Sequence, residues 1–134
     1  MNSKDYILDY LKKTIFPILL VGIWINISET IRWIFLIESL WIEYYQKMGL
    51  VFPNESANAI IWVIWGFIFA IILYILSKRF NPVQTALISW LVVFVMLWIV
   101  LWNINILPIK ILGYVVPLSL FEAYIGALIY KKLL

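Results

Sequence analysis

The sequence predicts an all-α membrane protein, a bundle of four transmembrane helices with its N- and C-termini in the cytoplasm. Hydrophobic residues make up 66% of the 134 residues and charged residues only 13%, whereas a soluble domain carries about 25% charged residues. Four apolar runs are long enough to cross a hydrocarbon core roughly 30 Å thick. Basic residues gather in the segments beside these runs, and mainly on one side. The expected location is therefore the cell membrane, crossed several times.

The composition also excludes several functional classes. The chain has no cysteine and no histidine, which removes disulfides, thiolate nucleophiles and the usual zinc and haem ligands. We therefore expect no metal, no cofactor and no catalytic residues. The net charge of +3 is small, so nucleic acid is not an expected partner. The short basic clusters beside apolar runs suit lipid headgroups, and membrane lipids are the expected partners.

The first span is predicted over residues 15–38. Residues 1–13 before it place tyrosine, isoleucine and leucine at helical spacing, which is typical of a helical turn lying at the membrane interface. Pro17 is expected in the first turn of the spanning helix, where its missing N–H would have no partner. Helical character is expected to continue to Lys47, beyond the membrane.

The second span is predicted over residues 58–77 and contains no charged residue within its apolar run. The segment 49–56 before it is expected to form a loop, since it contains glycine, proline and asparagine. Asn54 or Ser56 is expected to cap the helix.

The third and fourth spans are predicted over residues 83–102 and 109–130. Asn81 is expected to cap the third helix, with Pro82 at its first position. The fourth contains Pro117, which should kink it. We find no internal repeat and no linker, so residues 1–134 are predicted to form a single domain.

The orientation follows from the distribution of basic residues. Seven flank the spans on the side of the termini: Lys4, Lys12, Lys13, Lys78, Arg79, Lys131 and Lys132. The other side has Lys47 and Lys110, and Arg32 lies inside a span. Because short cytoplasmic segments are enriched in lysine and arginine, both termini are predicted to be cytoplasmic.

The candidate site consists of polar residues at membrane depth. Asn26, Glu29 and Arg32 are three residues apart and fall within an arc of about 120° on one helix face. Glu122 adds a charge in the fourth span, shortly after Pro117. Charged residues inside a membrane persist when they are paired or hydrogen-bonded, or when they line a cavity. We therefore expect the first and fourth helices to be neighbours, with Asn26, Glu29, Arg32 and Glu122 facing one another.

Three functions remain open for this site. In the first, it binds or passes a small ligand or cation, because two carboxylates and one guanidinium lack one positive charge. In the second, the Glu–Arg–Glu network only fixes helix packing in a structural or assembly subunit. The third is a lipid-modifying enzyme with Glu29 or Glu122 as a general base, and it ranks last because no nucleophile or metal-ligand set accompanies them.

The stripe of small residues Ser119, Ala123 and Ala127 in the fourth span is typical of close helix packing. We expect a homodimer or another small homo-oligomer that uses this face.

Several short patterns give the chain a resemblance to a group of proteins. They are Trp24-x-Asn26-x-x-Glu29-x-x-Arg32, Gly49-Leu50-x-Phe52-Pro53, Trp102-Asn103, Leu107-Pro108 and Pro117-Leu118-Ser119-Leu120-x-Glu122. With these the chain resembles small bacterial four-helix integral membrane proteins that are uncharacterised in function, and the resemblance covers most of its length. It implies an inner-membrane location and brings no activity, substrate or cofactor.

Overall fold

The computed structural model describes all residues from 1 to 134, and every regular element is a helix. Four continuous helices are long and apolar enough to cross a membrane: Ser3–Lys47, Ser56–Ser77, Pro82–Asn103 and Ile109–Leu133. The prediction of four helices of membrane-spanning length is confirmed. Three of them match the predicted spans to within about three residues at each end, and the first is much longer.

The first helix is a single rod made of five consecutive segments. They are α1 (Ser3–Tyr10), η1 (Leu11–Ile15), α2 (Phe16–Arg32), η2 (Trp33–Ile37) and α3 (Glu38–Lys47), where η1 and η2 are wider π-helical turns. At about 1.5 Å per residue, its 45 residues extend for about 68 Å. This is about twice the thickness of a hydrocarbon core, so in a membrane one or both ends would project beyond it.

Pro17 does not begin the helix as expected, because the chain is already helical from Ser3. A proline inside a helix removes one hydrogen bond, and its ring clashes with the carbonyl four residues earlier. The π-helical turn η1 ends two residues before Pro17, and a wider turn accommodates such a defect.

The second helix, α4 (Ser56–Ser77), is capped by Glu55, which was not among the predicted caps. The Glu55 side chain accepts the backbone N–H of Asn58, and Asn58 accepts the backbone N–H of Glu55 at 3.0 Å. This reciprocal pair is a capping box. The expectation that Asn54 or Ser56 would cap the helix is therefore wrong.

The third helix comprises α5 (Pro82–Trp90), the π-helical turn η3 (Leu91–Val95) and α6 (Met96–Asn103). Its predicted cap is confirmed, since Asn81 Oδ1 accepts the backbone N–H of Gln84 at 2.9 Å. The fourth begins with a short 3-10 turn, η4 (Ile109–Ile111), and continues as α7 (Leu112–Leu133).

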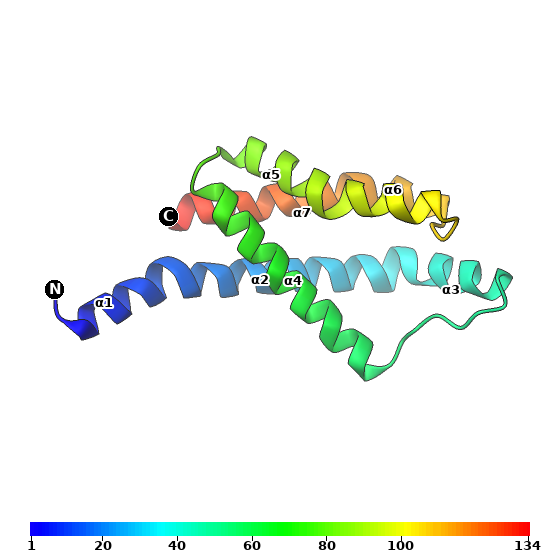
Figure 1. Ribbon diagram of the computed structural model, residues 1–134, viewed down its shortest axis with the longest axis horizontal. Helices are drawn as coiled ribbons and strands as arrows, with labels where there is room; N and C mark the ends of the chain where they lie inside the picture. Colours follow the sequence, from blue (N-terminus) through cyan, green and yellow to red (C-terminus); the bar gives the residue numbers. More distant parts are fainter.

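The first helix, the α5–α6 helix and α7 run along the long axis of the molecule, as Figure 1 shows. The α5–α6 helix lies beside α7, and α4 crosses the long first helix obliquely and contacts α2, α5 and α7. Helix α7 also contacts α2, so the predicted proximity of the first and fourth spans is confirmed. Both termini lie toward one end, whereas the end of α3 and the α6–η4 connection lie at the other (Figure 1). Which end faces the cytoplasm stays a prediction.

Only 24 of the 134 residues are buried, although two thirds of the chain is hydrophobic. Most of the apolar side chains therefore lie on the outside of the bundle. A surface of this kind is suited to lipid and not to water. The main internal cluster joins α2, α4, α5, η3 and α7 and consists of Val21, Ile25, Phe69, Ala70, Leu73, Ala86, Phe94, Ala123 and Tyr130.

The small-residue stripe of α7 is occupied within the chain. Ser119 and Ala123 are completely buried and Ala127 nearly so, because α5, α2 and α4 pack against α7. The stripe does bring helices close together, but it is not free to contact a second copy. The face on which the homodimer was predicted is therefore occupied within the chain. The oligomeric state stays a prediction.

Candidate functional site

Glu29 and Arg32 form an ion pair one helical turn apart, near the end of α2. The side chain of Arg32 is only 5% exposed, and that of Glu29 is 28% exposed. The spacing predicts this pair, since residues three apart on a helix lie on the same face.

A third helix contributes to the environment of Arg32. Its guanidinium lies 5.8 Å from the centre of the Phe94 ring in η3, within the range of a cation–π interaction. The Nε and Nη1 atoms of Arg32 are buried and have no hydrogen-bond partner. Phe94 was not among the predicted site residues, because one phenylalanine in an apolar run gives no signal that it faces a charge.

Glu122 lies on α7 and is completely buried. Its carboxyl group lies close to the side chains of Glu29 and Ser28 and within electrostatic range of Arg32. Neither of its carboxylate oxygens has a hydrogen-bond partner. Leaving a buried polar group without a partner costs about 1–3 kcal/mol, and more when it is charged.

The backbone at Glu122 is also held by α2. The indole Nε1 of Trp24 donates a hydrogen bond to the carbonyl oxygen of Glu122 at 3.0 Å. This bond joins the first and fourth helices at the level of the carboxyl cluster.

Asn26 has other partners. Its amide nitrogen donates to the carbonyl of Gly22 at 2.9 Å and to that of Val63 in α4 at 3.4 Å. A Cβ atom at Gly66 would approach the Asn26 amide to 2.6 Å, so Asn26 packs directly on α4. The structure thus brings Glu29, Arg32 and Glu122 together and gives Asn26 a separate contact between α2 and α4.

Further buried polar groups lie between α5 and α7. Trp90 Nε1 donates to Ser119 Oγ at 2.9 Å, and Ser119 Oγ donates to the carbonyl of Val115. Thr85 and Ser89 are also fully buried, and each hydroxyl donates to a backbone carbonyl of its own helix or the preceding turn. All these groups have partners, whereas Glu122 and Arg32 each have two buried polar atoms without a hydrogen-bond partner.

The cluster therefore has one more negative than positive formal charge. Glu29 and Glu122 share a single guanidinium, and no further basic side chain forms an ion pair with them. Burying a net charge in a medium of low dielectric constant is very unfavourable. The arrangement is suited to hold one additional positive charge, either a proton or a small cation. No group of three or more His, Cys, Asp or Glu side chains is placed to hold a metal ion.

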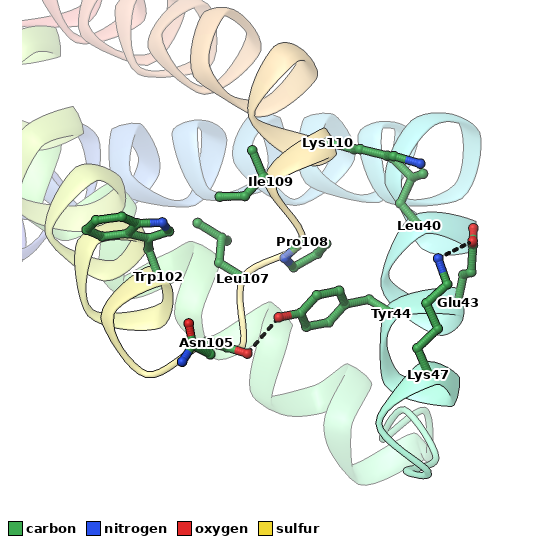
Figure 2. Close-up of a pocket in the computed structure, with 10 residues that line it drawn as sticks. All are labelled: Leu40, Glu43, Tyr44, Lys47, Trp102, Asn105, Leu107, Pro108, Ile109 and Lys110. Carbon is green, nitrogen blue, oxygen red and sulfur yellow. Dashed lines mark hydrogen bonds and ion pairs between the residues drawn. The ribbon is translucent and has the colours of Figure 1, made fainter.

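The two best-defined pockets lie away from this cluster. One, of about 380 Å³, lies at the end opposite the termini and is drawn in Figure 2. The other is an apolar groove along the third and fourth helices. Neither is lined by Glu29 or Glu122. A lipid held in either pocket would therefore not contact Glu29 or Glu122, the general bases of the hypothetical lipid-modifying enzyme.

No protein-family model, curated protein sequence or solved structure matches the chain. The resemblance to small bacterial four-helix membrane proteins stays a prediction.

Proposed function

We propose that the protein is a multi-pass membrane protein that binds one small cation, in the simplest case a proton, between α2 and α7. The binding group is the carboxylate pair of Glu29 and Glu122, and Arg32 supplies the fixed positive charge. One observation carries the proposal: both oxygens of a completely buried Glu122 lack a partner, beside a second carboxylate.

A bound positive charge would remove the charge imbalance. Protonation of one carboxyl group makes it a donor that can hydrogen-bond the other carboxylate. A dehydrated monovalent cation would instead be coordinated by oxygens of both groups. In either state Glu122 has no exposed surface, whereas Glu29 is 28% exposed, so the cation exchanges on the side of Glu29.

The proton form can be tested by infrared spectroscopy on the full-length protein in lipid nanodiscs. We expect a carboxylic-acid C=O band at neutral pH that disappears in Glu122→Gln. The matched control is Glu43→Gln, which removes an exposed carboxylate that is paired with Lys47. The band should persist in this control.

The cation form has its own test. The midpoint of thermal unfolding should rise when a large organic cation in the buffer is replaced by Na⁺ or K⁺, and this rise should vanish in Glu122→Gln. If the protein shows neither an acid band nor any dependence on the cation, the proposal is wrong.

A structural or assembly role is the second candidate, and the interhelical contacts of Trp24 and Arg32 favour it. The two roles predict different free energies of unfolding for Glu122→Gln. A neutral amide resembles a protonated carboxyl group, so the proton form of the site predicts a nearly unchanged free energy of unfolding with loss of the acid band. If the network is purely structural and Glu122 is ionised, Glu122→Gln removes a negative charge and should change the free energy of unfolding.

A further inference from the structure

The two pockets outside the charged cluster adjoin one another, because they share three lining residues. The pocket of about 380 Å³ lies between α3 and the α6–η4 connection, and the groove of about 360 Å³ runs along the third and fourth helices. Trp102, Leu107 and Ile109 line both. Together they form one elongated depression on the surface, within the size range of ligand sites.

The two halves of this depression differ in polarity. The half at the end of the bundle is lined by three charged side chains, Glu43, Lys47 and Lys110, as Figure 2 shows. The other half is lined by nine hydrophobic residues and no polar one. A ligand that fills both halves must carry a polar group at one end and an apolar chain at the other.

The polar half carries a net positive charge. Glu43 and Lys47 neutralise each other in an ion pair at 2.9 Å. Lys110 lines the same pocket and has no ion-pair partner within 4.0 Å. The matching ligand group is an anion such as a phosphate, which an ammonium group binds as a point charge.

The wall of the polar half is fixed by a hydrogen bond between distant parts of the chain. The Tyr44 hydroxyl in α3 donates to the carbonyl of Asn105 at 2.6 Å (Figure 2). Asn105 has a positive φ of 58°, which asparagine tolerates better than most residues. The bond holds the α6–η4 connection against α3, so both sides of the pocket are formed before a ligand arrives.

We propose that this depression binds one anionic phospholipid, with its phosphate at Lys110 and an acyl chain in the apolar groove. Trp102 lies where the two halves meet, a position typical of tryptophan at the boundary between headgroups and hydrocarbon. A free phosphate would leave the apolar half empty, and a neutral or zwitterionic headgroup would leave the charge of Lys110 without a match. This site is independent of the cation site between α2 and α7.

The test is native mass spectrometry of the full chain released from detergent. The protein is mixed with phosphatidylglycerol or with phosphatidylcholine, and the two lipids carry the same acyl chains. We expect tighter binding of phosphatidylglycerol. Lys110→Ala should weaken that binding about fivefold, the effect expected for one lysine near an anionic lipid. Lys110→Arg should preserve it. Lys132→Ala, which removes the same charge near the C-terminus, should have a clearly smaller effect.

A second pair of variants tests the apolar half. Ile99 lines the groove, so Ile99→Trp should fill it and weaken the binding of both lipids. Ile64 on α4 is equally exposed and lies outside both pockets, so Ile64→Trp is the control. The proposal is overturned by equal binding of the two lipids, by equal effects of Lys110→Ala and Lys132→Ala, or by inorganic phosphate displacing the lipid.

Discussion

Replacing Arg32 with methionine should destabilise the protein more than removing all three charges of the cluster. Arg32 is nearly buried and pairs with Glu29. It also lies near Glu122, whose oxygens have no other partner. Arg32→Met leaves two carboxyl groups beside each other without a positive charge. Breaking a buried ion pair in this way costs about 3–5 kcal/mol.

Two features of the structure adjust this figure in opposite directions. A carboxyl group left without its ion-pair partner in a medium of low dielectric constant can be neutralised by a proton, which places the loss of unfolding free energy near the lower limit. Loss of the contact between Arg32 and the Phe94 ring adds about 1 kcal/mol. We therefore expect about 3–4 kcal/mol for Arg32→Met. The triple variant Arg32→Met/Glu29→Gln/Glu122→Gln should lie within about 1–2 kcal/mol of the wild type, because no unpaired charge remains.

The assay is reversible unfolding in lipid bicelles, followed through tryptophan fluorescence or steric trapping, at one pH and salt concentration. Lys78→Met provides a control for removing a positive charge outside the cluster. If Arg32→Met is no less stable than the triple variant, the three residues do not act as one charged unit and the reasoning fails.

Three other variants or measurements test the fold. Gly66→Ala should destabilise the protein by about 1–3 kcal/mol, because the new Cβ would meet the Asn26 amide at 2.6 Å, and adding Asn26→Ala should recover part of the loss in the same unfolding assay. Tyr130→Phe should cost about 1–2 kcal/mol of unfolding free energy, since the Tyr130 hydroxyl donates to the buried Ala70 carbonyl at 2.6 Å; Tyr124→Phe, at an exposed position of the same helix, should change little. Reporter fusions at Met1 and at Leu134 should both give a cytoplasmic signal, and a periplasmic signal at either end would contradict the predicted topology.

The sequence was sufficient to predict the number of helices and their approximate limits, because crossing a membrane requires about 20 consecutive apolar residues. Local rules also identified the Asn81 cap and the Glu29–Arg32 pair, since both depend on spacing along one helix. The cap at Glu55 was missed, because several neighbouring residues can cap a helix and backbone geometry decides among them.

Contacts between helices were harder to predict. The 3.6-residue period indicates which residues share a face, but not which neighbour that face meets. Asn26 therefore contacts α4 and not Glu122, and Phe94 joins the cluster from a helix without charges. The stripe at Ser119 is equally suited to a neighbour in the same chain or in a second copy, and the structure uses it within the chain.

The small number of buried residues has a consequence for how this sequence can change in evolution. At most positions on the outside of the bundle, isoleucine, leucine, valine and phenylalanine are interchangeable, because each is equally soluble in lipid. Neutral drift there should be fast and should erase similarity without altering the fold. Selection should instead act on a few scattered positions, such as Gly66, Trp24 and Glu122. A saturation mutagenesis screen for folded protein should therefore tolerate apolar exchanges along most of the chain and reject them at these positions.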